Sequence, residues 1–583
     1  MWTLMGLSLI DWVIIGFYCG LSLGVGIYFS RRASKNIREF FLSGSSLSWW
    51  LLGTSMVATT FGADTPLAVT EYVRNDGIWR NWFWWNVALG GLLGVFVFSR
   101  LWRRAEVLTD NELIELRYSG RPAKILRAFK AGYFCTIYNF IVMGWVIQAM
   151  ATVLQVVLGI PAEMQWASIA ICVCIALAYT VLSGFWGVVV TDLFQFLLCM
   201  AGSIVLAVYS LNAVGGIDKL KLQLAQMDGG SGATMNFFPP LHVDGETGFL
   251  GSPLFTFIIF ITIMWWSSHN ADGGGYIIQR MLAAKNEAHS LIGTLWFNIA
   301  HYALRTWPWV IVALATMVAF PDITREHSKD AYPMAINAFL PHGLKGLLVA
   351  SFMAAFMSTI DTHLNWGSSY FINDIYKRFI RKSSSERHYV LVSRIASVVL
   401  MFIAGIVALQ MDSITAAWEF LIPMSAGIGL VLILRWFWWR INAWSEISAL
   451  IASMVINVPL VIEGVDVQHR FMVIVPFSIM VWVSVTFLTE PIPKEQLMKF
   501  YSKVRPGGVW GPVKRELPHI KRGVLGWGLL IEWFSGVALI YGSTFGIGKI
   551  IFHDYAAGVA LLGIAAVGGG VIIYRLTRKE AFS

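Results

Sequence analysis

Apolar runs of about 20 residues recur along the whole chain, and this is the length that an α-helix needs to cross a bilayer. Hydrophobic residues make up 57% of the 583 residues, and charged residues only 13%. Helices are the expected spanning form, because an unpaired backbone group in hydrocarbon costs several kcal/mol and the ~10-residue alternation of barrel strands is absent. The sequence therefore predicts an all-α membrane protein surrounded by membrane lipid.

We count roughly fifteen such runs by this length criterion. They lie at residues 9–29, 47–74, 78–99, 126–158, 163–183, 185–213, 252–283, 289–320, 343–378, 388–410, 415–438, 444–463, 469–489, 524–548 and 555–575.

The distribution of basic residues predicts the orientation. An odd number of spans places the termini on opposite sides, and most of the 43 Lys and Arg residues fall in the loops after alternate spans. Cytoplasmic loops collect such residues, so the cluster Arg31, Arg32, Lys35 and Arg38 and the stretch 494–522 are predicted to lie inside. We expect a multi-pass protein of the plasma (inner) membrane with its N-terminus outside and its C-terminus cytoplasmic. This topology explains the formal charge of +9 without nucleic-acid binding.

Two runs are poor continuous helices. The run 47–74 contains Gly53, Gly62 and Pro66, and the run 252–283 contains His269, Asn270, Asp272 and the glycines 273–275. Glycine and proline weaken helices, and a matched pair of interrupted helices is typical of a transporter site between inverted repeats. The alternative is a pair of flexible helices with packing glycines. The repeat interpretation predicts an extra helix and loop at 1–46, repeats at 47–213 and 251–440, an outer loop at 214–250, and additional helices at 441–583 with an inner loop at 490–522.

Polar residues also occur at membrane depth, where burying them costs free energy and they are usually functional. Asp192 and Gln195 lie three residues apart on one helix face. Ala355, Ser358, Thr359 and Thr362 follow a helical spacing and form one stripe, with Asp361 beside it. Such a stripe either allows close helix packing or supplies oxygen ligands to a hard cation, and both interpretations stay open. Arg305 lies within a span and needs either an aspartate or backbone carbonyls as its partner.

The sequence contains no HExxH, GxSxG or phosphate-loop motif, so we do not expect an enzyme, and no obligate protein partner is evident. Transport is the favoured function. A proton-coupled carrier of the same fold and a non-transporting membrane sensor are the alternatives, although the chain ends a few residues after its last predicted helix and leaves little room for a signalling module.

Five motifs in order resemble the sodium/solute symporter family, which includes bacterial proline, galactose and sialic acid carriers. They are T-D-x-x-Q at 191–195, QR-x-L-x-AKN at 279–286, DAYP-x-A at 330–335, LPHGLKGLLVASFMAAFMSTID-x-HLN at 340–365, and NDIY at 373–376. The resemblance extends from the first span to about residue 515. It implies a core like that of the bacterial leucine transporter, with two inverted repeats of five helices and two broken helices.

The resemblance also implies how sodium, the coupling ion, is bound. In this family the shared sodium site uses two carbonyls of the first broken helix, here Ala58 and Phe61, and a carbonyl and two hydroxyls of the eighth core helix, here Ala355, Ser358 and Thr359. Members that move two sodium ions add an aspartate and a further hydroxyl, which match Asp192 and Thr362. Asp361 stands where the sialic acid carriers have a hydroxyl. It would make the second site more acidic, hold its cation more tightly, or take a proton.

The expected cargo is a small polar organic solute: an amino acid, a sugar or a sugar acid. The galactose carriers have Asn and Gln on the first broken helix and Asn on the second, where this chain has Thr60, Thr65 and Gly274. The aromatic gate position is kept as Tyr276. The candidate solute-binding residues are Thr60, Asp64, Thr65, Asn86, Trp266, His269 and Tyr276.

Overall fold

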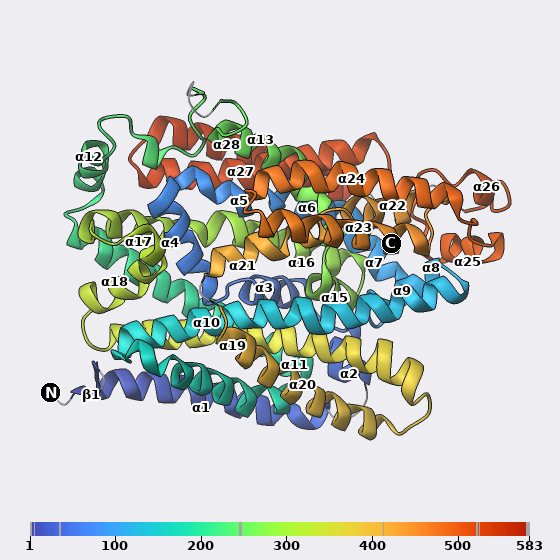
Figure 1. Ribbon diagram of the computed structural model, residues 1–583, viewed down its shortest axis with the longest axis horizontal. Coiled ribbons are helices and arrows are strands. Elements are labelled where there is room, and N and C mark those ends of the chain that lie inside the picture. The colour runs from blue at the N-terminus through green and yellow to red at the C-terminus, as the bar shows by residue number, and fades with distance from the viewer. Residues whose placement is uncertain are drawn as a thin grey trace.

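The computed structural model describes residues 3–4, 6–33, 37–243, 248–411, 413–520, 523 and 525–578. Lys35, used above for the orientation, and parts of both long polar loops lie outside these residues. The described chain is almost entirely helical, with one short antiparallel hairpin of β1 (Thr3–Leu4) and β2 (Leu7–Ser8). The long helices run roughly along the longest axis of the molecule (Figure 1).

The first part of the chain holds α1 (Leu9–Ala33), α2 (Ile37–Leu42), η1 (Ser43–Ser45), α3 (Trp49–Thr59), α4 (Asp64–Asp76), η2 (Ile78–Asn81), α5 (Trp82–Trp85), α6 (Val87–Leu93), η3 (Gly94–Phe98), α7 (Ser99–Ala105), α8 (Glu112–Arg117), α9 (Gly120–Tyr133), η4 (Phe134–Tyr138), α10 (Asn139–Leu158), η5 (Ala162–Met164) and α11 (Gln165–Ala213). Here η marks 3₁₀ and π segments.

The middle part holds α12 (Ile217–Met227), η6 (Ala233–Met235), α13 (Pro253–Ile259), η7 (Phe260–Met264), α14 (Trp265–Ser267), α15 (Gly275–Ala283), α16 (Glu287–Ile299), η8 (Ala300–Leu304), α17 (Thr306–Ala319), η9 (Arg325–Asp330), α18 (Ala331–Phe339), α19 (Leu344–Ser369), η10 (Tyr370–Ile380), α20 (Glu386–Ala408), α21 (Ile414–Leu421), η11 (Pro423–Ser425) and α22 (Gly429–Phe437). The last part holds α23 (Ala443–Ile462), α24 (Val467–Leu488), α25 (Lys494–Val504), α26 (Gly511–Lys514), α27 (Trp527–Ile551) and α28 (Tyr555–Arg578).

Within the described residues, eleven helices are long and apolar enough to cross a membrane, or twelve if the bent pair Ile414–Ser425 and Gly429–Phe437 forms one span. The other predicted spans are not counted among these helices. Ala162–Leu177 is only the described apolar part of the predicted span 163–183, within α11, the pair around residue 427 bends by 41°, and two predicted spans are interrupted. We call residues 60–63, between α3 and α4, the first interruption, and residues 268–274, between α14 and α15, the second interruption.

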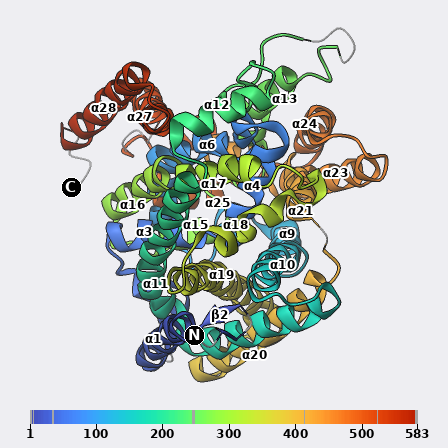
Figure 2. The ribbon, with the colours of Figure 1, turned by 90° about the vertical axis from the view of Figure 1, so that its left-hand side faces the viewer.

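The two longest polar segments lie at opposite ends of the bundle. Figure 1 shows α12 at the left end and α25 with α26 at the right end. The C-terminal helices α27 and α28 pack on each other at the periphery, where α27 also contacts α6 and η8 (Figure 2). Figure 1 shows α3 and α15, which adjoin the two interruptions, in the central part of the bundle.

Glycines allow α3 and α16 to approach each other closely. A Cβ atom on Gly53 would lie 2.4 Å from the carbonyl oxygen of Gly293, and a Cβ on Gly293 would lie 2.9 Å from the carbonyl oxygen of Trp49. Neither position has room for a side chain. This contact fixes the helix that leads into the first interruption against α16.

The first helix is anchored to the start of α19 by a buried carboxylate. Asp11 Oδ1 accepts hydrogen bonds from the backbone N–H groups of Gly343 and Gly346, at 2.6 and 2.7 Å. These are N–H groups of a helix start, which lack partners inside their own helix. A Cβ on Gly346 would lie 2.4 Å from Asp11 Cα. The absence of a side chain at Gly346 thus permits the contact.

Gly346→Ala is expected to lower the melting temperature of the purified protein, because the added methyl group meets the backbone of α1 and overpacking typically costs about 1–3 kcal/mol. The measurement is thermal unfolding in detergent. Gly20→Ala on α1 is the matched control, since a Cβ there meets nothing within 4 Å. Equal melting temperatures for the two variants would contradict the close contact between α1 and α19.

Candidate functional site

The first interruption faces the hydroxyl stripe of α19. Thr359 Oγ1 donates a hydrogen bond to the carbonyl oxygen of Thr59 at 2.9 Å and also lies 3.1 Å from the carbonyl oxygen of Ala355. Phe61 and Ala355 line the same small cavity. Ser358 and Thr359 are only 1% and 6% exposed, so the stripe faces protein rather than lipid. The structure therefore places Phe61, Ala355 and Thr359, three of the residues predicted for the shared sodium site, next to the end of α3.

Asp192 lies beside this stripe, on α11. Its Oδ1 accepts a hydrogen bond from Ser358 Oγ, and its Oδ2 accepts one from Ser55 Oγ, both at 2.5 Å. Asp192 is completely buried. Ser358 thus connects the residues predicted for the shared site with the aspartate predicted for a second one.

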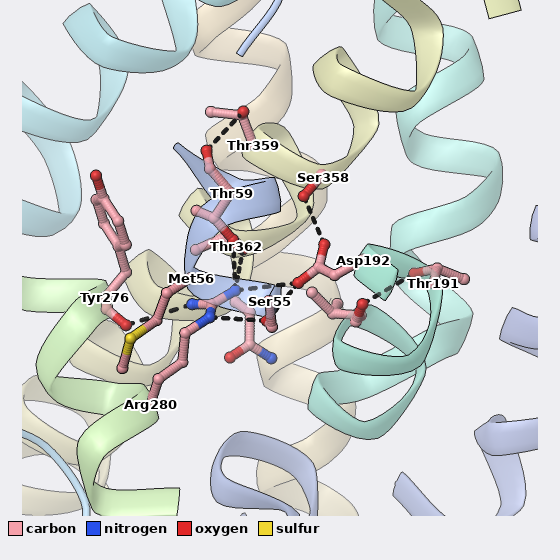
Figure 3. A network of polar contacts seen from close by, with 12 residues as sticks. Ser55, Met56, Thr59, Thr191, Asp192, Tyr276, Arg280, Ser358, Thr359 and Thr362 are labelled. Atoms are coloured by element: carbon pink, nitrogen blue, oxygen red, sulfur yellow. Dashed lines mark hydrogen bonds and ion pairs between the residues drawn. The ribbon is translucent and has the colours of Figure 1, made fainter. Parts of the chain in front are cut away.

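A buried arginine completes this network, which we call the Asp192–Arg280 network (Figure 3). Arg280 Nη2 lies 2.6 Å from Thr59 Oγ1, 2.8 Å from Thr362 Oγ1 and 3.3 Å from Asp192 Oδ2. Arg280 Nε donates to Ser55 Oγ at 2.8 Å. Both charged side chains are 0% exposed. The guanidinium therefore lies among the oxygens of Asp192 and Thr362, and joins α15 to α3, α11 and α19.

This arrangement has an electrostatic consequence. Two like unit charges 4 Å apart repel by about 4 kcal/mol at an effective dielectric constant near 20. A cation bound to Asp192 and Thr362 would share both oxygen atoms with the Arg280 guanidinium. Asp361, the other acid predicted for a second site, is completely buried and leaves α19 about 100° away from Thr362.

Arg305, for which the sequence left two kinds of partner open, binds a backbone carbonyl. Its Nη1 donates to the carbonyl oxygen of Thr60 at 2.5 Å, within the first interruption. Its Nη2 lies 2.8 Å from His301 Nε2, which must accept this bond because arginine only donates. His301 Nδ1 then donates to Thr60 Oγ1 at 2.9 Å. Arg305 thus stabilises carbonyl groups at the end of α3, where a cation is favourable.

Three candidate solute-binding residues lie at or beside the first interruption. Thr60 contacts Arg305 and His301, as described, and Thr65 is buried at the start of α4. Asp64 folds back over Gly62, since a Cβ on Gly62 would lie 2.0 Å from Asp64 Oδ1 and 3.3 Å from Thr359 Oγ1. The carboxylate of Asp64 and the hydroxyl of Thr359 therefore flank the same backbone segment.

The other four candidates have different hydrogen-bond and ring partners. Asn86 Nδ2 donates to the carbonyl oxygens of Trp82 and Phe83, and Trp266 Nε1 donates to that of Thr262, so both side chains bond to their own helical segment. His269 Nδ1 lies 2.8 Å from Ser425 Oγ at the second interruption. Tyr276 packs its ring against His363 and Trp366 on α19. These four side chains thus make their hydrogen bonds and ring contacts with other partners than Thr60, Asp64 and Thr65 do.

Four charged residues near the second interruption form what we call the charge quartet. Asp272 Oδ2 accepts from Arg435 Nη2 at 2.5 Å and from Trp436 Nε1 at 2.9 Å. Glu446 accepts from Lys130 Nζ at 3.2 Å and from Arg435 Nη1 at 3.3 Å. The quartet contains two acids and two bases, so its formal charges cancel. It connects the second interruption with α9, α22 and α23.

Sequence reasoning missed the roles of Arg280, His301 and the charge quartet. Arg280 was part of a recognised motif, but its partners come from three other helices. The available signal was the same as for Asp192, namely an ionisable residue in an otherwise apolar segment. For the quartet, the signal was the presence of Asp272 among the glycines of the second interruption.

A helical membrane bundle whose interrupted segments face a buried, hydroxyl-lined helix has the organisation of a secondary transporter. The sequence model of the sodium:solute symporter family matches residues 40–455, and the chain belongs to this family. Sodium is accordingly the coupling ion, and the protein is a multi-pass membrane transporter.

Similar proteins include curated relatives and a solved structure. The chain is 26% identical to a sodium/glucose cotransporter of Vibrio parahaemolyticus over 474 residues, which cover 77% of this chain and 84% of the relative. It is 27% identical to a sodium/mannose cotransporter of Bos taurus over 490 residues, covering 77% and 78% of the two chains. A substrate-bound, outward-open Na⁺-coupled sialic acid symporter matches with a TM-score of 0.66 at 18% identity, over 83% of this chain and 99% of that chain, which shows a shared fold.

Proposed function

We propose that the chain carries a small polar organic solute (an amino acid, a sugar or a sugar acid) together with sodium by alternating access. Sodium would lie between the first interruption and α19, held by the carbonyl oxygens of Ala58, Phe61 and Ala355 and the hydroxyls of Ser358 and Thr359. The strongest support for this ion site is that the buried hydroxyl of Thr359 contacts the carbonyl oxygens of both Thr59 and Ala355. Five such oxygens suit a hard cation.

The hydrogen bonds of these oxygens are compatible with cation binding. Ser358 donates its proton to Asp192, and Thr359 donates its proton to a carbonyl, so each hydroxyl oxygen keeps lone pairs for a cation. Ala58 O accepts the backbone N–H of Phe61 at 3.0 Å, and the backbone N–H of Thr60 is also directed at it. Asp64 beside Gly62 adds negative charge close to the proposed ion.

The proposed mechanism follows from the helices that the sodium ion would connect. Sodium would join α3 and α4 to α19 and favour an outward-open state that binds solute, and its release inside would reverse the change. One ion gains ~2.3 kcal/mol across ~100 mV and ~1.4 kcal/mol from a tenfold concentration ratio, enough for ~500-fold solute accumulation.

The proposed architecture is a core of two five-helix inverted repeats, 47–213 and 251–440, with the two interruptions in corresponding positions. The N-terminus would lie outside and the C-terminus in the cytoplasm of a cell whose plasma (inner) membrane holds the protein. The placement of α12 and the basic α25–α26 segment at opposite ends of the bundle supports this orientation (Figure 1).

Sodium-dependent stabilisation tests the proposed function. We expect sodium chloride to raise the melting temperature of the purified protein above its value in potassium chloride of equal ionic strength, because a ligand that binds only the folded state stabilises it. A panel of sugars, sugar acids and amino acids is then screened, and the transported solute should stabilise more strongly in sodium than in potassium. Equal effects of sodium and potassium would contradict the proposal.

A further inference from the structure

We propose that residues 494–515, which we call the inner strap, bind the headgroups of anionic phospholipids at the membrane surface. The strap contains α25 and α26 and lies at the right end of the bundle in Figure 1. This inference does not depend on sodium coupling, because the strap contains none of the residues proposed to hold the ion.

The inner strap has an apolar side and a basic side. Its large apolar side chains are buried in the main hydrophobic core, namely Leu497, Phe500, Tyr501, Val504, Trp510 and Val513. Its charged side chains are all exposed, and they comprise one acid, Glu495, and six bases, Lys494, Lys499, Lys503, Arg505, Lys514 and Arg515. The strap therefore carries a formal charge of +5, all of it on its exposed side.

Little of this charge is balanced by the protein itself. Lys494 pairs with Glu516 at 2.5 Å, and Lys503 lies 3.7 Å from Glu106, with all four side chains exposed. Exposed ion pairs of this kind contribute little. The other four bases of the strap form no ion pair within the described residues. Their charges can therefore attract an anionic partner from outside the chain.

The position of the inner strap indicates that this partner is lipid. The strap lies between the end of α24 at Leu488 and the start of α27 at Trp527, and both of these side chains are 85% exposed. Only 33% and 39% of the apolar windows of these two spans are buried, so both helices present much of their surface to lipid. Tryptophan at the end of a span is typical of the headgroup region, and basic clusters next to a span bind anionic lipids.

The inner strap is also attached to the helix that contacts the second interruption. Val509 donates its backbone N–H to the carbonyl oxygen of Phe437 at 2.6 Å, and Trp510 Nε1 donates to the carbonyl oxygen of Trp436 at 3.1 Å. Trp436 Nε1 in turn donates to Asp272 Oδ2 at 2.9 Å. A lipid bound to the strap would therefore also hold the end of α22 and its contact with Asp272.

Reconstitution of the full-length protein into lipid nanodiscs tests the inference. We expect a melting temperature several degrees higher in phosphatidylcholine mixed with phosphatidylglycerol than in phosphatidylcholine alone, because a ligand that binds the folded state stabilises it. The difference should shrink at high salt, which screens exposed charges. Equal melting temperatures in the two lipids at low salt would overturn the inference. An equal rise from inorganic phosphate in phosphatidylcholine alone would also overturn it, since a free anion would then suffice.

A variant of the inner strap provides the second test. Lys499→Gln, Lys514→Gln and Arg515→Gln together remove three exposed charges, and a loss of about fivefold in lipid affinity per charge amounts to about 100-fold. The rise in melting temperature with phosphatidylglycerol should therefore disappear. The matched control removes three exposed bases from another predicted inner loop and should keep the rise: Arg381→Gln, Lys382→Gln and Arg387→Gln. If the strap variant keeps the rise, or if both variants lose it equally, the strap is not the lipid-binding surface.

Discussion

Replacing Ser358 or Thr359 by alanine is expected to raise the sodium concentration needed to stabilise the protein by about tenfold or more. Each change removes one of the five oxygens proposed to hold the ion, in a site whose side chains are almost completely buried. A hydrogen-bonding group lost from a buried charged site typically costs about 1–3 kcal/mol, and 1.4 kcal/mol corresponds to a tenfold weaker affinity. The measurement is the sodium concentration that gives half of the maximal rise in melting temperature.

Two controls separate ion binding from a general packing effect. Ser369→Ala removes a buried hydroxyl from the same helix, one that only bonds to the carbonyl oxygen of Trp366 at 2.7 Å, and it should leave the sodium midpoint unchanged. Thr359→Ser keeps the oxygen and should retain sodium binding. If the midpoints of Ser358→Ala and Thr359→Ala both equal that of the wild-type protein, the proposed sodium site is wrong.

The hydroxyl stripe could be found in the sequence because its geometry is local. Residues at positions i, i+3 and i+4 share a helix face whatever the rest of the chain does, so Ala355, Ser358 and Thr359 were grouped correctly by spacing alone. The positions of the two interruptions were also indicated locally, by the glycines and the proline within them. In both cases neighbouring residues determine the local backbone.

The Asp192–Arg280 network could not be found in this way. The partners of Arg280 lie 88 residues away at Asp192, 221 at Thr59 and 225 at Ser55. Such contacts depend on how four helices pack, which periodicity does not contain. The sequence identified each charge as unusual but gave no distance between them.

The candidate solute-binding residues illustrate a different limit of sequence-based prediction, namely the partners of polar side chains. Asn86 and Trp266 are polar or amphipathic residues near interrupted or strained helix segments, which made them candidates. Their side chains donate hydrogen bonds to carbonyl groups three or four residues earlier in their own segments, and their role in solute binding stays a prediction. A sequence does not distinguish a side chain that satisfies its own backbone from one that binds a ligand, since both kinds occur beside helix breaks.

Glu446→Gln is expected to lower the melting temperature of the purified protein by several degrees, through the charge quartet. Glu446 is 0% exposed, and its neighbours Lys130 and Arg435 are only 6% and 3% exposed. Removal of its charge leaves the quartet with two bases and one acid, and the nearby acid Asp110 then lines the same cavity as Lys130 and Arg435. Removing one partner of a buried ion pair typically costs about 3–5 kcal/mol, because the other charge stays buried without compensation. The measurement is thermal unfolding in detergent.

The charge balance can be tested apart from the loss of hydrogen bonds. Combining Glu446→Gln with Lys130→Met removes one acid and one base, so Asp272 and Arg435 remain as a balanced pair at 2.5 Å. The double variant should therefore be more stable than Glu446→Gln alone. Glu516→Gln is the matched control, since its partner Lys494 is 53% exposed and such pairs contribute little. Residues in one charge network are expected to have non-additive effects on stability. If Glu446→Gln and Lys130→Met instead lower the stability additively, the charges of the quartet do not act as a balanced unit.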